Sequence, residues 1–536
     1  MSESTTAVRN LVELMDERAG RLDRAVLYNY LATGERWTFA DLPVRAARVA
    51  GQLANAGMEP GARVGILAED RAVFCDAFYG LQHLGAIPVP LGLAGRAGSE
   101  AWCAVLRDRV QRLGLVALAT DAASATALGA AVPELRTIGV DGSRGNPVPA
   151  GPTNEVAFIQ PSSGTTGHPK GIVISQTAVL ANLRSIREQW DLTEADSGLS
   201  WLPLFHDMGL IGTVINALHT GGTLHHWPAE SFLRSPGRWV ELLGELAVTI
   251  AIAPPFALEL VTRRWRRRGG DADLSSVRSL LVGAETIRPS VIEGFAEVFE
   301  PLGLRPDALC PTYGLAEATL GVTAKPRGER FRTVDDGLHR WVSCGRPIPD
   351  VTIRLEPETG ELLVRSPALM SGYLDDAESS AAAFDGDWLR TGDVAQIIDD
   401  EVLIVGRLKE MINRNGQRVA AADFELAVQG TEGVLPDRVV AFGDVGDAGE
   451  RVVLLAESRY RRARAGAVVL ALRAKLADAG LPADVVELVP AGFIPRTTSG
   501  KLRRGAARDR WQSAPPSGGE ALLPLEVAPL RVGDER

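Results

Sequence analysis

One polar loop of this sequence combines residue types that can hold a polyphosphate. The segment SSGTTGHPKG, residues 162–171, carries three glycines, two serines, two threonines and Lys170 between two apolar runs. Backbone N–H groups, hydroxyl groups and one ammonium can together surround phosphate oxygens. The spacing is not that of a Walker A loop, because G-x4-G-K-S/T is absent and GIVIS, which follows, predicts a strand. A flexible cover over phosphates therefore fits better than a cradle at a helix start, and a polar hairpin turn is the alternative.

Lysine is rare in this chain, and its positions single out candidate sites. Of the 57 basic residues only five are lysines, at positions 170, 325, 409, 475 and 501. A chain that uses arginine for almost every cation keeps lysine by chance or where a compact ammonium is needed. Three of the five stand in polar loops with glycine, so these loops are candidate functional sites.

The elements around these loops indicate an α/β protein. Strand-like apolar runs alternate with helical periods through the first four hundred residues, as in layered α/β folds with buried sheets. The later part changes: residues 354–366 predict a hairpin with a Glu-Thr-Gly turn, and residues 401–407 predict another strand. The strand-like runs of the first part are 63–69, 86–92, 156–160, 171–175, 248–254 and 279–285.

The chain is long enough for several folding units. We expect a large domain over residues 1–408 and a small α+β domain over residues 409–511, with a strand pair near 438–458 and a helix over 467–479. Residues 512–536 are rich in proline and glycine and predict a flexible tail.

Composition excludes several classes of function. With 57 basic and 67 acidic residues the net charge is −10, and no basic stripe predicts a nucleic-acid partner. The cluster Arg263–Arg268 is short and predicts the solvated end of a helix. The longest apolar stretch, residues 115–132, is interrupted by polar residues, and the chain start lacks a leader pattern, so we expect no membrane span.

Cysteine and histidine positions argue against a zinc site. The four cysteines, Cys75, Cys103, Cys310 and Cys344, show no CxxC spacing and favour a reducing cytoplasmic location. His219, His225 and His226 have no carboxylate or thiol nearby to complete a ligand set, so surface or sheet-edge positions are expected for them.

Five motifs in order resemble those of a known superfamily. The phosphate loop is followed by PTYGLAEATL (311–320), LRTGD (389–393), GRLKEMINRNGQRV (406–419) and PRTTSGKLRR (495–504). This series is similar to the adenylate-forming acyl-activating enzymes, which include acyl-CoA synthetases, fatty acyl-AMP ligases, carrier-protein adenylation domains and luciferases. The resemblance implies a large N-terminal domain of layered α/β subdomains with a small β-barrel-like part, and a small mobile α+β C-terminal domain.

The resemblance also implies sites for ATP and Mg2+. Glu317 would help to hold Mg2+, for which oxygen is the right ligand, although alone it could be a charge at a helix start. Asp393 would bind the ribose hydroxyls with Arg407 nearby, although alone it could cap a turn. The further implied residues are Ser163, Gly164, Thr165, Thr166, Gly167 and Lys170 at the phosphates, with Thr166 also at Mg2+, and Gly283, Ala284, Glu285, Tyr313 and Gly314 around the adenine.

Three further positions are implied to act in catalysis or domain movement. Lys501 would bridge the carboxylate and the α-phosphate during adenylation and stabilise the developing negative charge. His206, in WLPLFHDMGLIG, is either a core histidine or a residue that gates the carboxylate against the phosphates. Glu410 would be the interdomain hinge, and the loop with Gly416 would face the thiol arm after domain rotation.

The sequence also gives expectations for the acid that is bound and for the thiol that accepts the acyl group. An apolar carboxylic acid is favoured, because APPFALELV (253–261) offers no obvious acidic partner for an amino group. The segment 324–341 is shorter than the insertion usual in fatty acyl-AMP ligases, which keeps CoA ligation open. We therefore expect thioester formation with CoA first and delivery of acyl-AMP to a carrier protein second. A relative with only the thioester-forming half-reaction and a non-catalytic nucleotide-binding relative are further alternatives. The implied pocket residues are Phe205, Met208, Gly209, Pro255 and Phe256.

Overall fold

The computed structural model describes residues 8–92, 98–162, 170–335, 340–414, 417–446, 449–459, 465–496 and 502–513. The chain divides into two compact units between Leu408 and Lys409. Among the described residues, no apolar cluster includes residues from both units. Each unit therefore has hydrophobic cores of its own.

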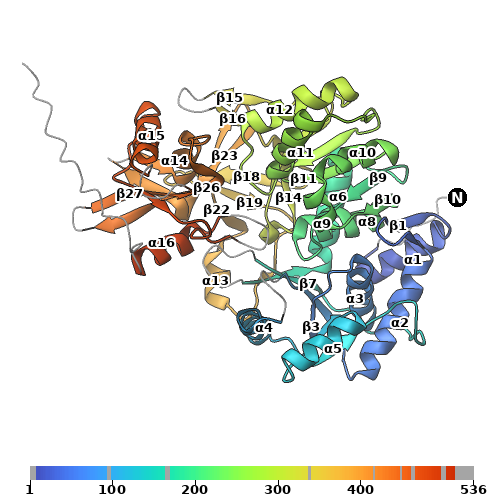
Figure 1. Ribbon diagram of the computed structural model, residues 1–536. Coiled ribbons are helices and arrows are strands. Elements are labelled where there is room, and N and C mark those ends of the chain that lie inside the picture. Colours follow the sequence, from blue (N-terminus) through green and yellow to red (C-terminus); the bar gives the residue numbers. More distant parts are fainter. Residues whose placement is uncertain are drawn as a thin grey trace, which may run out of the picture. The chain divides into compact units, whose positions relative to one another are not determined.

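A nine-stranded sheet forms the centre of the first unit (Figure 1). Its order is β17-β14-β13-β12-β11-β9-β10-β1-β2, and the six strands from β13 to β1 run parallel. Parallel strands inside a sheet are covered on both faces, which explains the apolar runs of β11 and β12. The bounds are β1 Val26–Tyr30, β2 Glu35–Thr38, β9 Ser197–Ser200, β10 Thr223–His226, β11 Ile250–Ala253, β12 Ser279–Val282, β13 Leu309–Gly314, β14 Gly321–Ala324 and β17 Arg346–Pro347.

Helices cover both faces of this sheet. Leu280 and Val282 of β12 lie in one apolar cluster with α10, α11 and α12, whereas Leu281 packs against a second cluster that contains Trp190 of α6. The predicted solvated end at Arg263–Arg268 is the exposed carboxyl-terminal turn of α11. The helices of this layer are α1 Leu11–Arg21, α6 Gln176–Trp190, α7 Asp207–Gly209, the π-helical turn η1 Leu210–Ile215, α8 Asn216–Thr220, α9 Ala229–Arg234, α10 Pro236–Glu245, α11 Pro255–Arg268, α12 Pro289–Phe299, and the 3-10 turns η2 Glu300–Leu302 and η3 Ala316–Ala318.

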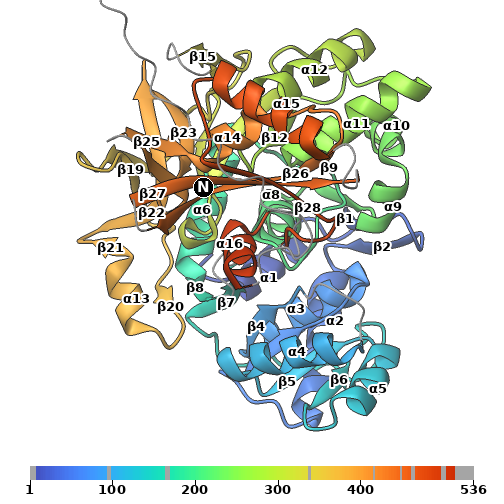
Figure 2. The same ribbon diagram turned by 60° about the vertical axis from the view of Figure 1, so that its left-hand side comes forward.

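A four-stranded parallel sheet of order β4-β3-β5-β6 makes a second layer with α2, α3, α4 and α5 (Figure 2). The bounds are β3 Arg63–Ile66, β4 Ile87–Pro90, β5 Ala117–Thr120, β6 Thr137–Gly139, α2 Asp41–Asn55, α3 Arg71–Leu84, α4 Glu100–Arg112 and α5 Ala122–Ala131.

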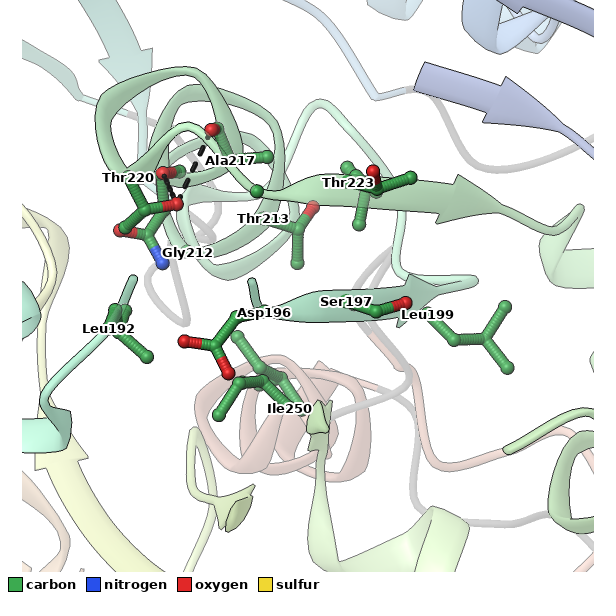
Figure 3. A pocket seen from close by; sticks show the side chains of 15 residues that line it. Leu192, Asp196, Ser197, Leu199, Gly212, Thr213, Ala217, Thr220, Thr223 and Ile250 are labelled. Carbon is green, nitrogen blue, oxygen red and sulfur yellow. Dashed lines mark hydrogen bonds between the residues drawn. The ribbon is translucent and has the colours of Figure 1, made fainter. Parts of the chain in front are cut away.

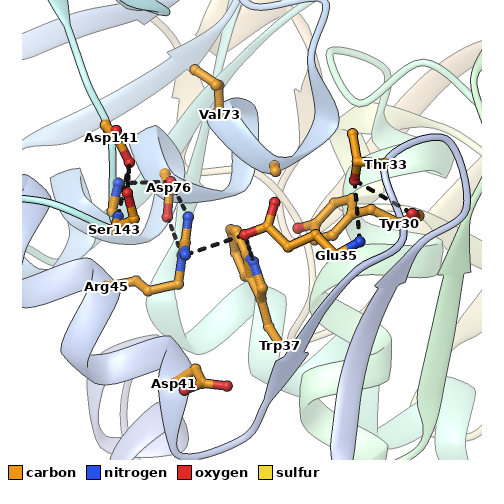
Figure 4. Close-up of polar contacts among 12 residues, drawn as sticks. Tyr30, Thr33, Glu35, Trp37, Asp41, Arg45, Val73, Asp76, Asp141 and Ser143 are labelled. Atoms are coloured by element: carbon orange, nitrogen blue, oxygen red, sulfur yellow. Dashed lines mark hydrogen bonds and ion pairs between the residues drawn. The ribbon is translucent and has the colours of Figure 1, made fainter.

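A buried ion pair joins α2 to α3 in this layer (Figure 4). Arg45 donates from Nε and Nη2 to the two oxygens of Asp76, at 2.9 and 2.7 Å, and its guanidinium lies 3.9 Å from the ring centroid of Trp37. The backbone N–H of Gly142 donates to the same carboxylate at 2.8 Å. Burial raises the pKa of Asp76, while Arg45 acts in the opposite direction. The bidentate geometry offsets only part of the cost of burying the Asp76 charge, since its pKa stays raised.

Three smaller sheets complete the described part of the first unit, one of them the antiparallel pair of β15 and β16. The sheet of order β20-β8-β7 carries the ends of the phosphate loop, and GIVIS is strand β8, as predicted. The antiparallel sheet of β18, β19, β21, β22 and β23 is the β-barrel-like part, and the Glu-Thr-Gly hairpin joins β18 to β19. The bounds are β7 Val156–Pro161, β8 Gly171–Ser175, β20 Gly372–Tyr373, β15 Thr333–Asp335, β16 Arg340–Val342, β18 Thr352–Leu355, β19 Glu361–Arg365, α13 Ala377–Ala382, β21 Phe384–Asp385, β22 Trp388–Ile398 and β23 Glu401–Arg407.

The second unit is α+β, as the sequence predicts. In its three-stranded sheet β26 pairs antiparallel with β27, and β27 pairs parallel with β28. One apolar cluster packs α14 and α15 against this sheet, and a second lies under α16. The bounds are η4 Leu408–Glu410, β24 Met411–Arg414, β25 Gln417–Ala420, α14 Ala421–Ala427, β26 Val434–Gly446, β27 Gly449–Ser458, α15 Ala465–Asp478, β28 Val485–Val489 and α16 Arg504–Ser513.

Within the described ranges, no helix is long and apolar enough to cross a membrane.

The expected surface or sheet-edge positions of three histidines are wrong for two of them. His226 ends β10, an interior strand, and is 1% exposed, and His219 of α8 is buried too. Burial lowers the pKa of His219 to about 3 and that of His226 well below its ordinary value. His225 is half-buried on β10. The sequence did not show that β10 lies between β9 and β1, where its neighbours exclude water.

Candidate active site

The two ends of the phosphate loop are held together by hydrogen bonds. Ser162 donates its backbone N–H to the Lys170 carbonyl at 2.8 Å, and the backbone N–H of Lys170 donates to the Ser162 hydroxyl at 2.9 Å. The strands before and after the loop, β7 and β8, pair antiparallel, so a strand and not a helix follows the loop. The predicted phosphate residues Ser163, Gly164, Thr165, Thr166 and Gly167 lie outside the described residues.

Tyr373 connects Lys170 to Glu317. The Lys170 ammonium lies 4.4 Å from the Tyr373 ring centroid and 3.8 Å from a carboxylate oxygen of Asp376. The Tyr373 hydroxyl donates to Glu317 Oε1 at 3.1 Å. Pairing of β20 with β8 places Tyr373 opposite Ile172, two residues after Lys170. Sequence reasoning missed Tyr373, because its neighbours SGYL show no catalytic pattern.

Glu317 lies in the short turn η3 and has a perturbed carboxyl group. Burial raises its pKa above the ordinary value, and Asp207 acts in the same direction. The Tyr373 hydroxyl and the charge of Arg407 act in the opposite direction. The ionised carboxylate would therefore be stabilised by a nearby cation.

The donor set at Glu317 is compatible with Mg2+. This cation is held in nucleotide sites by one or two carboxylates together with phosphate oxygens and water. Among the described residues there is no group of three or more His, Cys, Asp or Glu side chains that could hold a metal. Glu317 would thus supply one protein oxygen, and phosphate would supply others.

The segment from Gly314 to Leu320 is held in a strained turn. Thr319 has φ 65° and ψ −60°, and Leu320 donates its backbone N–H to Ala318 O at 2.8 Å, which is a γ-turn of the rare kind. A Cβ on Gly314 would lie 1.8 Å from the Leu320 carbonyl oxygen. The Thr319 hydroxyl donates to Ala368 O at 2.6 Å and fixes the turn. Strain of this kind is common at functional sites.

Tyr313, Asp393 and Arg407 form a second cluster. The Tyr313 hydroxyl donates to Asp393 Oδ2 at 2.7 Å, and Arg407 Nε lies 2.9 Å from Asp393 Oδ1. Asp393 and Arg407 are opposite one another in the β22–β23 pair. Burial and the Asp393 charge raise the pKa of Tyr313. The structure thus brings together three residues that the motifs placed far apart in sequence.

The segment Gly283–Glu285 follows the carboxyl end of β12, next to β13 with Tyr313. A Cβ on Gly283 would lie 2.7 Å from Thr312 Oγ1 and 2.9 Å from Thr312 O, so the two strand ends approach closely. Ala284 has a backbone φ of 72°, a conformation that residues other than glycine rarely adopt. Ligands bind at such strand ends in α/β sheets.

His206 lies at the start of α7 with an acidic neighbour. Its Nδ1 is 2.5 Å from Asp207 Oδ1, and its side chain is 22% exposed. His206 is therefore not a fully buried core histidine.

Three of the predicted acyl-pocket residues flank His206 in the chain, and the other two begin α11. Phe205 packs on Gly92, where a Cβ would lie 2.3 Å from the ring. Met208 and Phe256 pack against the same apolar cluster, and Phe256 lies 6.1 Å from Trp201 between ring centroids. Gly209 is required for close approach, since a Cβ would lie 2.1 Å from Pro203 O, and Pro255 begins α11.

In the second unit, Glu410 is paired within its own unit. Arg504 donates from Nη1 to Glu410 at 2.5 Å and from Nε and Nη2 to Glu425 at 2.6 and 2.7 Å. Burial raises the pKa of Glu425, and Arg504 acts in the opposite direction. Lys501 and Gly416 lie outside the described residues.

Comparison with known proteins decides the family. A model of AMP-binding enzymes matches residues 15–374. The chain belongs to the AMP-binding enzyme family. This AMP-binding enzyme is 32% identical to the long-chain-fatty-acid AMP ligase FadD26 of Mycobacterium marinum, over 94% of this chain and 97% of that protein. It is 31% identical to a protein of Caulobacter vibrioides named as a candidate acyl-CoA synthetase, over 88% of this chain and 90% of that protein.

Solved structures agree with this assignment. A structure from a study of fatty acyl-adenylate ligases from E. coli and L. pneumophila superimposes on this AMP-binding enzyme with a TM-score of 0.85 at 27% identity. The match covers 94% of this chain and 98% of the other. The expected superfamily and fold class are therefore confirmed.

Proposed function

We propose that this AMP-binding enzyme joins an apolar carboxylic acid to a thiol through an acyl adenylate, with release of pyrophosphate and AMP. The observation that carries this proposal is the pair of clusters in the first unit, Lys170–Tyr373–Glu317 and Tyr313–Asp393–Arg407. One cluster offers an ammonium and a carboxylate suited to phosphate and Mg2+. The other offers a buried carboxylate that can accept two hydrogen bonds from a ribose.

In the first half-reaction, a carboxylate oxygen of the acid attacks the α-phosphorus of ATP. The bond from this phosphorus to the bridging oxygen breaks, and pyrophosphate leaves with the electron pair. Lys170 and the loop beside it stabilise the charge on the phosphates, and Gly283, Ala284, Glu285 and Tyr313 hold the adenine. Mg2+ bound with Glu317 and Thr166 would supply further neutralisation of phosphate charge.

The acid enters between the segment with His206 and the start of α11. Phe205, Met208, Gly209, Pro255 and Phe256 give this pocket an apolar surface, which favours an acyl group without a charged substituent near the carboxylate. His206 holds the carboxylate toward the phosphates. Lys501 bridges this carboxylate and the α-phosphate, and stabilises the charge that develops during attack.

In the second half-reaction, the sulfur of a thiol attacks the acyl carbon, the bond to AMP breaks, and the thiol proton is released. Domain rotation at Glu410 would bring the loop with Gly416 to the thiol arm. We propose CoA as the acceptor, supported by the short β14–β17 connection, whose described residues contain only the hairpin β15–β16. The AMP-ligase name of the Mycobacterium marinum relative favours a carrier protein as the second candidate acceptor.

One reaction series tests the proposal. The full chain is incubated with ATP, Mg2+ and a panel of apolar acids, with and without CoA, and products are identified by mass spectrometry. Acyl-CoA together with AMP supports the CoA ligase, whereas acyl-AMP that accumulates regardless of CoA supports an acyl-AMP ligase. If no acid gives either product, supplied acyl-AMP tests for an enzyme with the second half-reaction alone, and failure there overturns the proposal.

Matched variants separate the ribose cluster from general effects on the protein. Asp393→Asn should lower acyl-AMP formation about a hundredfold, because a buried charge-assisted interaction with the nucleotide is lost. Asp400→Asn, at an exposed position in the β22–β23 turn, should leave the rate unchanged.

A further inference from the structure

A cavity of about 50 Å³ lies in the first unit between the central sheet and the helical segment that follows His206 (Figure 3). Its walls are the first residues of β9, β10 and β11, together with η1 and α8. The residues proposed to bind the nucleotide lie at the other ends of the strands, the carboxyl ends of β12 and β13. The volume is sufficient for several water molecules or a short polar group.

The cavity is lined by elements that adjoin the predicted acyl-pocket residues, because η1 follows Gly209 and β11 precedes Pro255. Gly212 lines it and lies one helical turn beyond Met208. A Cβ on Gly212 would lie 3.1 Å from Leu320 Cδ2 and 3.3 Å from Ile252 Cδ1. From Ala253 at the end of β11 to Ile250 at the cavity is about 10 Å along the strand. An acyl chain that starts beside Pro255 and follows β11 therefore ends in this cavity.

Three polar side chains of the cavity wall have partners within the protein. The Thr220 hydroxyl donates to Asn216 O, the Thr223 hydroxyl donates to Val26 O, and Asp196 is paired with Arg278 at 2.6 Å. The side-chain Oδ1 of Asn216 is buried and has no hydrogen-bond partner in the part of the chain that the structure describes. Leaving a buried amide oxygen unpaired is unfavourable, and a ligand that donates a hydrogen bond would relieve this.

We propose that this cavity receives the far end of the acyl group, and that Asn216 selects acids with a hydroxyl group there. The apolar residues Leu199, Ile250 and Ile252 contact the methylene groups, and Gly212 provides the wall with a position at which a larger side chain would crowd Leu320 and Ile252. The substrate class is a medium-length carboxylic acid with a hydroxyl at its distal end. The inference rests on the proposed function, since it assumes that an acid is adenylated beside Pro255.

Acid-dependent pyrophosphate release by the full chain tests the selection. Pairs of acids with equal chain length are compared, one with a terminal hydroxyl and one with a terminal methyl. The wild type should prefer the hydroxy acid about tenfold in kcat/KM, and Asn216→Leu should reverse this preference. The control Asn55→Leu, at an exposed asparagine that ends α2, should keep the wild-type ratio.

A second variant tests the proposed path of the acyl chain past Gly212. Gly212→Val should lower kcat/KM at least about tenfold for acids long enough to reach Ile250, and should spare short acids. Gly294→Val, a helical glycine of α12 outside the cavity, should affect all acids alike or not at all. Binding of a nonreacting ATP analogue checks that each variant is folded.

Different failures have different meanings. An unchanged hydroxy-to-methyl ratio in Asn216→Leu, no preference in the wild type, or an equal loss for short and long acids in Gly212→Val overturns this inference alone. If no acid causes pyrophosphate release by the wild type, the proposed function itself fails.

Discussion

At the level of single residues, Tyr373 links two groups of opposite charge that the motifs treat separately. Its ring lies under the Lys170 ammonium, and its hydroxyl donates to Glu317. Both contacts stabilise charged forms, one by the ring quadrupole and one by a hydrogen bond. The arrangement orients an ammonium and a carboxylate before a nucleotide arrives.

The raised pKa of Glu317 predicts pH-dependent binding of the magnesium nucleotide. Because burial favours the neutral carboxyl, the ionised form that binds the cation is lost as the pH falls through a pKa above the ordinary value. Affinity for Mg2+ with a nonreacting ATP analogue, measured by calorimetry between pH 5 and pH 8, should fall toward the acid end. Glu317→Gln should bind weakly and lose this dependence, whereas Glu358→Gln, an exposed glutamate, should retain it.

Removal of the Tyr373 hydroxyl should move the same titration. In Tyr373→Phe the carboxylate of Glu317 loses its hydrogen-bond donor, so its pKa rises further and the binding curve shifts to higher pH. Tyr373→Leu also removes the ring below Lys170 and should weaken nucleotide binding at every pH. Equal curves for the wild type and Tyr373→Phe would contradict this role.

At the level of elements, the turn from Gly314 to Leu320 positions Glu317 by close backbone contact. Gly314→Ala should displace the turn, because its Cβ would overlap the Leu320 carbonyl oxygen at 1.8 Å. We expect a loss of about 2 kcal/mol or more in the free energy of unfolding, measured with urea, together with weaker binding of the ATP analogue. Gly20→Ala, in open space near the end of α1, should change neither property appreciably. Unaltered nucleotide binding by Gly314→Ala would refute the positioning role.

The ion pair between α2 and α3 sets a stability prediction. Asp76→Asn removes the buried carboxylate from Arg45 and leaves this largely buried cation with only the more exposed Glu35 at 3.3 Å, so the free energy of unfolding should fall by about 3 kcal/mol. Asp108→Asn breaks the exposed pair of Asp108 with Arg112 and should cost less than about 1 kcal/mol. Urea unfolding followed by fluorescence compares the two, and similar losses would argue against the importance of burial.

At the level of the whole molecule, the two units have separate apolar cores, as the proposed domain rotation between half-reactions requires. The residue that the family resemblance assigns to adenylation, Lys501, belongs to the second unit. Lys501→Ala should lower acyl-AMP formation roughly 10²- to 10³-fold and spare thioester formation from supplied acyl-AMP. The control Lys475→Ala changes another lysine of the second unit. The Lys475 ammonium donates to Gln429 O, and its removal should leave both rates unchanged. Near wild-type adenylation by Lys501→Ala would exclude the proposed role.

The rare lysines have different surroundings. The Lys170 ammonium lies over the Tyr373 ring, whereas Lys325 is buried and donates to the carbonyl oxygens of Asp307 and Pro326, both at 3.0 Å. A compact ammonium suits either task, because it can hold phosphates or satisfy several carbonyl groups. Residue type alone therefore could not separate a binding lysine from a structural one.

The sequence by itself determined the local elements and the family. Apolar runs of four to six residues are strands here because they can bury both faces, and the Glu-Thr-Gly turn between alternating residues is a hairpin. Five ordered motifs carried enough information to indicate the superfamily, because each requires particular side chains at fixed spacing.

Only the tertiary structure decided which of these residues meet. Tyr373 reaches Glu317 because β20 pairs with β8, and His226 is buried because β10 lies inside the sheet. The cavity at Asn216 depends on β9, β10 and β11 lying side by side under η1 and α8. Such contacts join residues far apart in the chain, and local periodicity contains no information on strand order or on the burial that follows from it.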